Sequence, residues 1–516
     1  MTRTNLQLLI TVFVSGMTTL AVELSASRLL GNIFGTSNLV WANIIGLMLL
    51  YLAAGYFIGG RWADHSPEPR TFYTILIVAA FLSALAPLVA RPVLRFAAEA
   101  MAALDAVVAG GSFLGVLILF SVPVTLLGCA SPFAIRLAVT DSRRTGELAG
   151  RIYAISTLGS LLGTFLPTLW LIPTIGTTST FLSFAGLLFA VAWLGLWNAD
   201  RRRALLSLIL PVIIAVLAAF SLSGSQRPIN GLIPESEVES AYNFIQVVEV
   251  NGTRYLLLNE GQGIHSIYNP NQLATNGTWD LFLAAPYFYA APRAPERLAV
   301  VGLAAGTIPR QYTAVFGPLP IDGIEIDGAI VEIGRKYFDM NLPNLNVIVD
   351  DGRYALAHSA HTYSVIGVDA YRVPYIPWHL TTREFFEEAR RKLSPEGVLV
   401  INVGRALEDR RLVDALVGTI SRVFPTVHVV DVPSSFNSIV YATVQPTSAD
   451  NLKMNLANLP ADAHPLLRAA LETAVANLQP TPASEIVFTD DLAPVEFISN
   501  SIVIDFFLRG GVEQLE

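Results

Sequence analysis

The stretch LAVVGLAAGTIPRQYTAVFGPLPIDGIEID, residues 298–327, decides the fold of the second half of the chain. It begins with an apolar run, LAVVG, that predicts a buried strand, and it ends in IDGIEID, which contains a second strand. The residues between them, through about 316, favour a helix. A strand, a helix and a strand in this order are typical of a parallel β-α-β unit.

The same alternation continues beyond this unit. Further strands are predicted at 346–350, 363–369 and 397–403, with two closing strands near 428–432 and 438–444. Further helices are predicted through Phe338, at 384–393 and at about 406–422. The sequence therefore predicts an α/β domain with a doubly wound, mostly parallel sheet. Such sheets bind ligands beyond the carboxyl ends of their strands.

A small β-hairpin region precedes this domain. Two β-rich runs flank Asn251-Gly252 in QVVEVNGTRYLLLN, and this dipeptide is the strongest short signal for a hairpin, here at about 241–268. The predicted boundaries are a polar linker at 223–240, the β-region at 241–290, the α/β domain at 291–445 and a C-terminal extension at 446–516.

Residues 1–222 differ in character from the rest. They carry 13 arginines, no lysine and 8 acidic residues, whereas the remainder carries 20 basic and 33 acidic residues. Apolar runs of about 20 residues, the length that a hydrocarbon core requires, predict a helical transmembrane domain. About seven spans are expected, at 6–30, 38–60, 71–90, 112–135, 152–173, 178–198 and 204–222. A weaker segment at 94–110 is expected to be an interfacial or re-entrant helix, or an eighth span.

Composition excludes several classes of protein. Hydrophobic residues make up 53% of the chain and charged residues 14%, so it is neither disordered nor wholly soluble. The acidic second half argues against nucleic acid as a partner and suits a cationic small substrate. The only cysteine, Cys129, lies in an apolar run, which excludes a disulfide framework. The first apolar run predicts no cleavable signal peptide.

Two features of the apolar half indicate roles other than crossing the membrane. The pairs Gly55/Gly59 and Gly159/Gly163 have the small-xxx-small spacing that lets helices approach closely. Glu23 is an ionisable residue inside a span and is a candidate to hold a cationic amine or a lipid head group. The alternative is that Glu23 and Arg28 pair with other charges and only fix helix registry.

Candidate ligand residues follow the first two strands of the α/β domain. Gly302 and Gly306 follow the first strand, and Glu325 ends the second, 19 residues after Gly306. An acid near this offset hydrogen-bonds ribose hydroxyls in nucleotide-binding α/β folds. Glu325 is therefore a candidate ribose ligand, and the alternative is a solvated carboxylate at a strand end.

Carboxylates also follow the third and fourth strands. The third ends in Asp350-Asp351-Gly352, where Asp351 either accepts from an adenine amino group or caps a helix. The fourth ends in Asp369-Ala370-Tyr371, followed by an irregular aromatic stretch to His379. A carboxylate at a strand end beneath such a loop resembles an active site under a lid, so we expect Asp369 to be functional.

These residues resemble the spermidine synthase (polyamine aminopropyltransferase) family, and the whole chain is similar to its multi-pass membrane form. The motifs that carry the resemblance are GYFIGGRWAD (55–64), AGRIYAISTLGSLLGT (149–164), IEID (324–327), DDGR (350–353), VDAY (368–371), HLTTREFF (379–386) and LSPEGVLVINV (393–403).

The resemblance implies a small β-domain followed by a class I methyltransferase-like (Rossmann-like) domain. It makes Glu325 the ribose ligand, Asp351 and Gly352 the adenine contact, and Asp369 the base that keeps the attacking amine neutral, with Tyr371 in the same motif. The implied co-substrate is decarboxylated S-adenosylmethionine, or S-adenosylmethionine itself, and no metal is implied. A protonated amine has no lone pair with which to displace a thioether, so a positioned carboxylate serves a clear need.

The chain departs from the family pattern in two places. The glycine loop reads GLAAGT, without the acid of the usual G-G-G-D-G loop. The region 275–286, TNGTWDLFLAAP, stands where the family carries an Asp-Glu pair and a Tyr-His-Glu stretch, and Asp280 is its only carboxylate. The candidate substrate-binding residues are therefore Asp280, His265, Glu23 and Asp490, the last from TDDLAPVE (489–496).

The sequence is compatible with three functions. The first is aminopropyl transfer from decarboxylated S-adenosylmethionine to a small amine, as in polyamine synthesis. The second is an S-adenosylmethionine-dependent methyltransferase acting on a membrane-associated acceptor. The third is a non-catalytic ligand-binding or transport protein with a degenerate synthase domain. The expected partners are the amine and the lipid bilayer, with a homodimer as a further possibility.

The arginine-rich loops bear on the side of the membrane that the second half occupies. Loops 61–70, 136–151 and 201–203 indicate the cytoplasmic side, and seven spans would then place residues 223–516 outside. Because adenosylated sulfonium donors are cytosolic, we expect instead a cytoplasmic soluble domain on an integral membrane protein of a prokaryotic plasma membrane.

Overall fold

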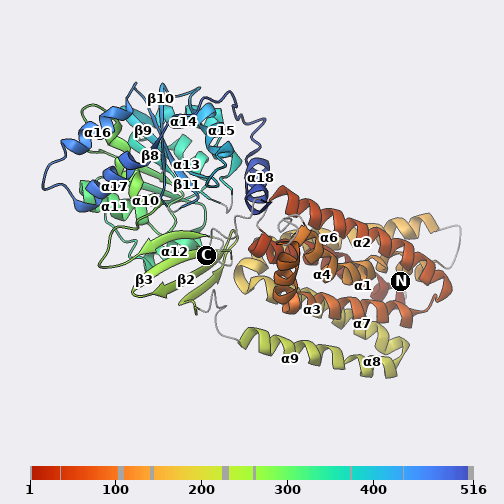
Figure 1. The fold of residues 1–516 in the computed structure, drawn as a ribbon. Coiled ribbons are helices and arrows are strands. Elements are labelled where there is room, and N and C mark those ends of the chain that lie inside the picture. The colour runs from red at the N-terminus through yellow and green to blue at the C-terminus, as the bar shows by residue number, and fades with distance from the viewer. Residues whose placement is uncertain are drawn as a thin grey trace. The chain divides into compact units, whose positions relative to one another are not determined.

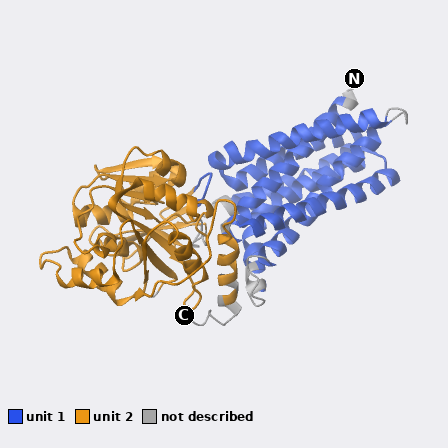
Figure 2. Ribbon diagram, turned by 90° about the horizontal axis from the view of Figure 1, so that it is seen from above, with its two compact units in different colours: residues 1–227, 239–244 blue, residues 228–238, 245–516 orange. Residues whose placement is uncertain are grey.

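The computed structural model describes two compact units, which are coloured separately in Figure 2. The first comprises residues 1–227 with 239–244, and the second residues 228–238 with 245–516. The described residues are 3–34, 37–102, 110–139, 145–223, 232–259, 263–371, 375–433 and 435–508. The first unit is helical, and the second combines helices with two sheets (Figure 1).

The first unit contains six helical stretches that are long and apolar enough to cross a membrane. Its helices are α1 (Arg3–Phe34), α2 (Asn38–His65), α3 (Pro69–Ala102), α4 (Ser112–Gly128), α5 (Ala130–Ala138), α6 (Thr145–Leu166), α7 (Ile172–Ala199), α8 (Arg201–Ser207) and α9 (Ile209–Ser223). The six stretches are dominated by apolar side chains, as spanning segments must be, although the last one begins with the three arginines of α8.

The sequence predicted seven spans, and the difference arises between α6 and α7. These two helices are joined through a π-helical turn, Pro167–Leu171, into one helical stretch, Thr145–Ala199. Gly176 breaks the stretch, with φ 79° and ψ 164°. Both α6 and α7 pack against α1. The fifth and sixth predicted spans are therefore separate arms of one continuous stretch, and glycine permits the break because it lacks a Cβ.

The weak segment predicted at 94–110 does not form a separate helix over its first part. Residues 94–102 continue α3, which tolerates Pro87 and Pro92 in its interior. Three charged residues, Arg95, Glu99 and Asp105, made 94–110 a weak candidate for a span, but an arginine near a helix end can extend its charged head toward the interface. Residues 103–109 lie outside the described part of the chain.

The small-xxx-small prediction is confirmed within the first unit. A Cβ on Gly159 would lie 2.0 Å from the carbonyl oxygen of Phe13, and one on Gly163 would lie 2.1 Å from that of Met17. A Cβ on Gly55 would lie 2.3 Å from the carbonyl oxygen of Thr125. Any larger residue at these positions would force the helices apart, so the glycines fix the packing of α6 on α1 and of α2 on α4.

A short segment from beyond α9 also belongs to the first unit. The carboxylate of Glu239 accepts hydrogen bonds from the backbone N–H of Thr177, at 3.0 Å, and from its hydroxyl. These groups begin the second arm of α7, where backbone N–H groups lack partners in the helix. Arg28 donates to the carbonyl oxygen of Ser240 at 3.4 Å. Residues 239–244 are thus tied to the helical unit at the break in α7.

The second unit begins with a four-stranded sheet in the order β1-β2-β3-β4. Its strands are β1 (Ser236–Glu239), β2 (Phe244–Val250), β3 (Thr253–Leu258) and β4 (Ile264–Tyr268). The predicted hairpin is confirmed: Asn251 and Gly252 both have positive φ, 52° and 75°, which suits a tight two-residue turn between β2 and β3. β1 lies in the segment predicted as a linker, because three of its four residues are polar and Val238 alone gives no apolar alternation.

The larger sheet has eight strands in the order β12-β10-β11-β9-β8-β5-β6-β7. Its strands are β5 (Leu298–Val301), β6 (Ile321–Glu325), β7 (Leu345–Val349), β8 (Tyr363–Val368), β9 (Leu393–Gly404), β10 (Thr426–Asp431), β11 (Asn437–Thr443) and β12 (Leu478–Gln479). The pairs among β5–β9 are parallel, and β10, β11 and β12 are antiparallel. Every strand that the sequence predicts between 298 and 444 is present.

Helices and loops cover the sheet on both faces and enclose two apolar cores. The connecting helices are α11 (Thr307–Phe316), α12 (Gly328–Tyr337), α13 (Gly352–His358), α14 (Arg383–Lys392) and α15 (Arg411–Ile420). One core packs α14 and α15 on residues such as Leu399 and Ile401 of β9. The other packs the segment around Trp279 on Val398 and Val400 of the same strand.

The C-terminal extension, to which the sequence analysis assigned no helices or strands, is built of regular elements. It forms α16 (Ala449–Ala457), α17 (Pro465–Ala476), the edge strand β12 and α18 (Val495–Leu508). Leu452, Leu466 and Leu471 join the second core, and Val495 joins the first. The extension therefore completes the α/β domain.

Candidate active site

Four adjacent strand ends of the large sheet form one polar edge. Val301, the last residue of β5, is paired with Ile324 of β6 on one side and Val368 of β8 on the other. Glu325 of β6 is in turn paired with Val349 of β7. The residues that follow these positions therefore meet at the carboxyl edge, as the sequence predicted.

Gly302 brings the glycine loop into backbone contact with Asp369. Its φ is 88°, and a Cβ at this position would lie 2.5 Å from the carbonyl oxygen of Asp369. Only glycine adopts this conformation readily and leaves room for such an approach. The loop after β5 and the carboxylate after β8 consequently belong to one site.

Glu325 is held by the main chain of this loop. Its carboxylate accepts from the backbone N–H of Ala304 at 2.9 Å and from that of Asp327 at 3.1 Å. The residue is 7% exposed, and burial raises its pKa to about 7 despite these two hydrogen bonds. It has no ion-pair partner among the described residues, so further hydrogen-bond donors would stabilise its charge.

The glycine loop is also fastened to the small sheet. The backbone N–H of Ala305 donates to the hydroxyl of Ser266 in β4 at 2.9 Å. Ala304 has a φ of 48°, an unusual value for a residue with a Cβ. A Cβ on Gly306 would lie 2.7 Å from the Met340 side chain, so Gly306 serves close packing.

Asp351 lies at the third strand end and uses both carboxylate oxygens within the protein. Oδ1 accepts from the backbone N–H groups of Arg353 and Tyr354, both at 3.0 Å, and so caps α13. Oδ2 lies 3.1 Å from Nε2 of His379. A Cβ on Gly352 would lie 2.5 Å from Val301. Asp351 therefore caps the helix, which was one of its two predicted roles, and its contact with adenine stays a prediction.

Asp369 is surrounded by neutral hydrogen-bond donors. The indole N–H of Trp279 donates to Oδ2 at 2.8 Å, and the side-chain amide of Asn402 donates to Oδ1 at 2.8 Å. Burial raises the pKa of Asp369 to about 6, although both hydrogen bonds act to lower it. The carboxylate is thus ionised near neutral pH and close to the range in which it can take up a proton.

Tyr371 and Asn437 extend this network. The Tyr371 hydroxyl donates to the backbone carbonyl of Asn402 at 3.1 Å, and burial raises its pKa well above the usual value. The Asn437 amide donates to Oδ1 of Asn402 at 2.8 Å. Tyr371 is therefore neutral and orients the strand end that carries Asn402, while a direct catalytic role for it stays a prediction.

Two of the predicted substrate ligands lie near this edge in different surroundings. Asp280 is 7% exposed and accepts from the backbone of Thr275 and Asn276, the Thr275 hydroxyl and the Gln311 amide. His265 lies on β4, and burial lowers its pKa to about 4, so its ring is neutral. Its Nε2 is buried without a hydrogen-bond partner in the described structure.

The other two predicted ligands, Asp490 and Glu23, make no described contact with Asp369 or its hydrogen-bond partners. Asp490 forms an ion pair with Arg353 at 2.7 Å and accepts from the Thr382 hydroxyl. Arg353 also pairs with Glu388 at 2.8 Å, so Asp490 helps to fasten the C-terminal extension. Glu23 is partly buried on α1 in the first unit. Substrate binding by these four residues stays a prediction.

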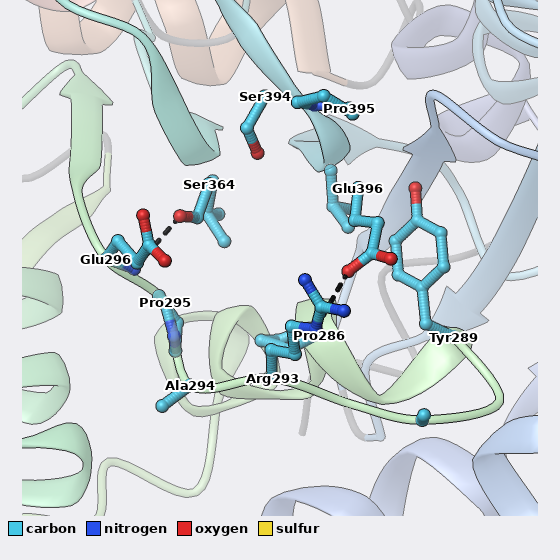
Figure 3. Close-up of a pocket in the computed structure, with 13 residues that line it drawn as sticks. Pro286, Tyr289, Arg293, Ala294, Pro295, Glu296, Ser364, Ser394, Pro395 and Glu396 are labelled. Atoms are coloured by element: carbon cyan, nitrogen blue, oxygen red, sulfur yellow. Dashed lines mark hydrogen bonds and ion pairs between the residues drawn. The ribbon is translucent and has the colours of Figure 1, made fainter.

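A pocket of about 240 Å³ lies at the opposite edge of the sheet, near the beginnings of β8 and β9 (Figure 3). Ser364, Pro395 and Glu396 line it, and Arg293 forms an ion pair with Glu396 at 3.3 Å. Because ligands of parallel sheets bind at the carboxyl ends, this pocket is not the candidate active site.

Sequence reasoning missed Trp279, Asn402 and Asn437. Asn402 and Asn437 lie on two strands that pair antiparallel, and Trp279 precedes the domain, so only the fold brings them to Asp369. One feature of the sequence could have pointed to Trp279: the region 275–286, which contains it, differs from the family pattern.

Comparisons with known proteins agree with this description. Residues 295–455 match the family described as "Spermine/spermidine synthase domain". Over 278 residues the chain is 31% identical to the probable polyamine aminopropyl transferase of Bifidobacterium longum, covering 51% of this chain and 61% of that protein. It is 35% identical over 112 residues to the polyamine aminopropyltransferase of Vibrio vulnificus, covering 21% of this chain and 38% of that one.

A solved structure, that of a probable spermidine synthase from Corynebacterium glutamicum, matches with a TM-score of 0.38 at 20% identity, over 46% of this chain and 94% of that one. The chain spans less than two thirds of the length of either relative above. The matched family segment lies wholly within the second unit and contains Glu325, Asp351 and Asp369.

Proposed function

We propose that this chain, a member of the spermidine synthase family through its domain at 295–455, is a membrane-bound aminopropyltransferase. It moves an aminopropyl group from decarboxylated S-adenosylmethionine to an amine. The observation that carries the proposal is the contact of Gly302 with Asp369, which joins the nucleoside side of the site to a partly buried carboxylate.

The donor's nucleoside fits the residues on the glycine side. Glu325 is a buried carboxylate with two backbone donors and no cationic partner among the described residues, and each carboxylate oxygen has further acceptor capacity. Ribose hydroxyls are donors of the kind that would stabilise it, at about 1.5–3 kcal/mol for each charge-assisted bond. Ile326, next in the chain, is 41% exposed and offers an apolar contact for the base.

Asp369 is suited to the amine side of the reaction. The lone pair of the amine nitrogen attacks the aminopropyl carbon bound to sulfur, the N–C bond forms, and the C–S bond breaks with its electron pair going to sulfur. The sulfonium becomes a neutral thioether, and the nitrogen loses one proton. An ionised Asp369 stabilises the positive charge on nitrogen and accepts that proton, and Trp279 and Asn402 fix its orientation.

The apolar helices support a location at a membrane. Six helical stretches of the first unit have the length and composition of spanning helices. We propose that they anchor the synthase domain to the bilayer, with the domain on the cytoplasmic side, where the donor is made.

The test is calorimetry and a transfer assay on the full chain in detergent. Decarboxylated S-adenosylmethionine and S-adenosylmethionine are titrated separately, and the thioether product is followed with an amine present. We expect the decarboxylated donor to bind and to yield aminopropylated amine. Methyl transfer from S-adenosylmethionine would support the methyltransferase instead, and binding of neither donor would refute both enzymes.

A further inference from the structure

On the amine side of the site, the described residues offer a ligand one carboxylate, Asp369, because the proposed function assigns Glu325 to the ribose. The two hydrogen-bond donors to Asp369, Trp279 and Asn402, are neutral, and so is Asn437 behind them. The sequence of the following loop, AYRVPYIPW (370–378), contains no acidic residue. The charge that faces an acceptor amine therefore comes from Asp369.

Two other carboxylates near this edge, Asp280 and Asp431, are already engaged. Asp280 accepts hydrogen bonds from three residues around it. Asp431, at the end of β10, pairs with Arg410 at 2.6 Å and with Arg405 at 3.4 Å and also accepts from Ser438. Each of these acids is neutralised or saturated within the protein, so neither can hold a second ammonium group.

The loop that follows β9 leads to the same conclusion. Asn402 to Leu407 include no acid, and the first acids beyond them are Glu408 and Asp409. Glu408 is exposed to solvent, and Asp409 pairs with Arg411. The nearest part of this loop therefore contributes no fixed negative charge.

Apolar side chains are exposed at the same edge instead. Trp378 follows the β8 loop and is 47% exposed, and Leu407 follows β9 and is also 47% exposed. Phe436 directly precedes β11, which runs antiparallel to β9, and is 38% exposed. Leu407 and Phe436 thus lie beside the strand end that carries Asn402, where the backbone N–H of Arg405 donates to the carbonyl oxygen of Phe436 at 2.7 Å, and Trp378 adds an exposed apolar side chain after the β8 loop.

We infer that the acceptor is an amine with one ammonium group on an apolar body, rather than a diamine. One carboxylate matches one ammonium, and an apolar surface gains from covering hydrocarbon. A second ammonium placed against such a surface without a partner would lose hydration with no compensation. This inference rests on the proposed function and specifies its acceptor.

The experiment compares two acceptors of nearly the same shape, 1,4-diaminobutane and pentylamine, which differ in that a methyl group replaces the second ammonium. The full chain in detergent is assayed with decarboxylated S-adenosylmethionine, and kcat/KM is measured for each amine. We expect pentylamine to be preferred by about tenfold or more. Equal use of the two amines, or preference for the diamine, would overturn the inference.

A reciprocal variant tests which residues set the preference. Asn437→Asp adds a carboxylate beside Asn402, one residue from Phe436, and should reduce the preference for pentylamine at least severalfold. Asn271→Asp adds the same charge at an exposed position and should leave the preference unchanged. An unchanged preference in Asn437→Asp would place the acceptor elsewhere. Thermal unfolding of both variants establishes that each is folded.

The outcomes separate this inference from the proposed function. If the donor binds and the diamine is preferred, the function stands and the inference fails. If the donor does not bind, or binds and neither amine reacts, the proposed function fails and the inference falls with it. Hexadecylamine in proteoliposomes, compared with pentylamine in solution, distinguishes a membrane-borne acceptor from a soluble one.

Discussion

Glu325 and Asp369 are carboxylates at two strand ends that lie on either side of β5, and they are held in opposite ways: Glu325 is buried and Asp369 is partly buried. Glu325 accepts from two backbone N–H groups, whereas Asp369 accepts from two side chains, Trp279 and Asn402. Burial raises the pKa of both, to about 7 and about 6. The first carboxylate depends on the fold of the glycine loop, and the second depends on residues that can be exchanged without altering the main chain.

This difference explains where the chain keeps the family pattern and where it departs from it. The IEID motif at Glu325 is intact, because its partners are main-chain groups that any sequence of this fold supplies. Near Asp369, neutral Trp279 stands in the region 275–286, which departs from the acid-rich pattern that the resemblance implies, whereas Asn402 lies in a motif that matches it. We therefore expect donor binding to be general to the family and acceptor choice to be particular to this chain.

Replacement of the side-chain-held carboxylate should have the largest effect. Asp369→Asn removes the charge and the proton acceptor, and we expect kcat to fall by about 10²–10⁴-fold. Donor affinity, measured by calorimetry, should change little because Glu325 is untouched. Asp450→Asn, at an exposed position on α16, is the matched control and should retain full activity. A kcat within threefold of the native value would remove Asp369 from the chemistry.

Replacement of the backbone-held carboxylate should act on the donor instead. Glu325→Gln removes the charge that ribose hydroxyls would meet, and we expect donor affinity to fall by about 10–100-fold. One backbone N–H would then face an amide donor, so some loss of stability is also expected. Glu332→Gln, exposed on α12, is the control. Unchanged donor affinity in Glu325→Gln would show that the nucleoside binds elsewhere.

The two pKa values predict two separate pH profiles. Donor affinity should weaken as pH falls below about 7, because protonated Glu325 is a poorer acceptor. The kcat at saturating donor should fall about tenfold for each pH unit below about 6, because protonated Asp369 cannot take up a proton. Calorimetry and initial rates from pH 5 to 8 measure the two midpoints. A single shared midpoint would contradict the assignment of the two carboxylates to separate steps.

The same pKa values predict an opposite trend for stability. Both are raised above the unfolded values of about 4, so the folded state binds more protons between pH 4 and 7. The contribution of these groups to stability is complete below about pH 4 and is lost as pH rises through 6 and 7. Asp369→Asn should flatten this dependence in thermal unfolding experiments, and an unchanged dependence would argue against the raised pKa.

The sequence predicted most of the large sheet, because its strands are short apolar runs between turn signals and their order follows from β-α-β alternation. It also predicted that Gly302, Glu325, Asp351 and Asp369 meet at one edge, since parallel strands end together. It missed the donors to Asp369, because Trp279 and Asn402 reach it from segments far apart in the chain. The C-terminal extension was missed because α16 and α17 gain their stability from packing on the second core.

Length arguments were weaker in the apolar half. They located the spanning helices but not the join between α6 and α7. Hydropathy depends on composition alone and does not report a break that comes from the backbone conformation of one glycine, Gly176. They also separated the charged segment 94–110 from the preceding span, although α3 continues to Ala102.

The smallest expected effect concerns the main chain that holds Glu325. Ala304 has a φ of 48°, which costs a residue with a Cβ about 1 kcal/mol. Ala304→Gly should relieve this strain and stabilise the domain by about 0.5–1 kcal/mol, while the N–H that bonds to Glu325 is retained. Ala305→Gly is the matched control: Ala305 is buried and is not among the residues with positive φ, so its loss should destabilise the domain. The midpoint of thermal unfolding should therefore rise in Ala304→Gly and fall in Ala305→Gly, and kcat should be unchanged in Ala304→Gly. A lower midpoint in Ala304→Gly would show that the loop stores no strain at this position.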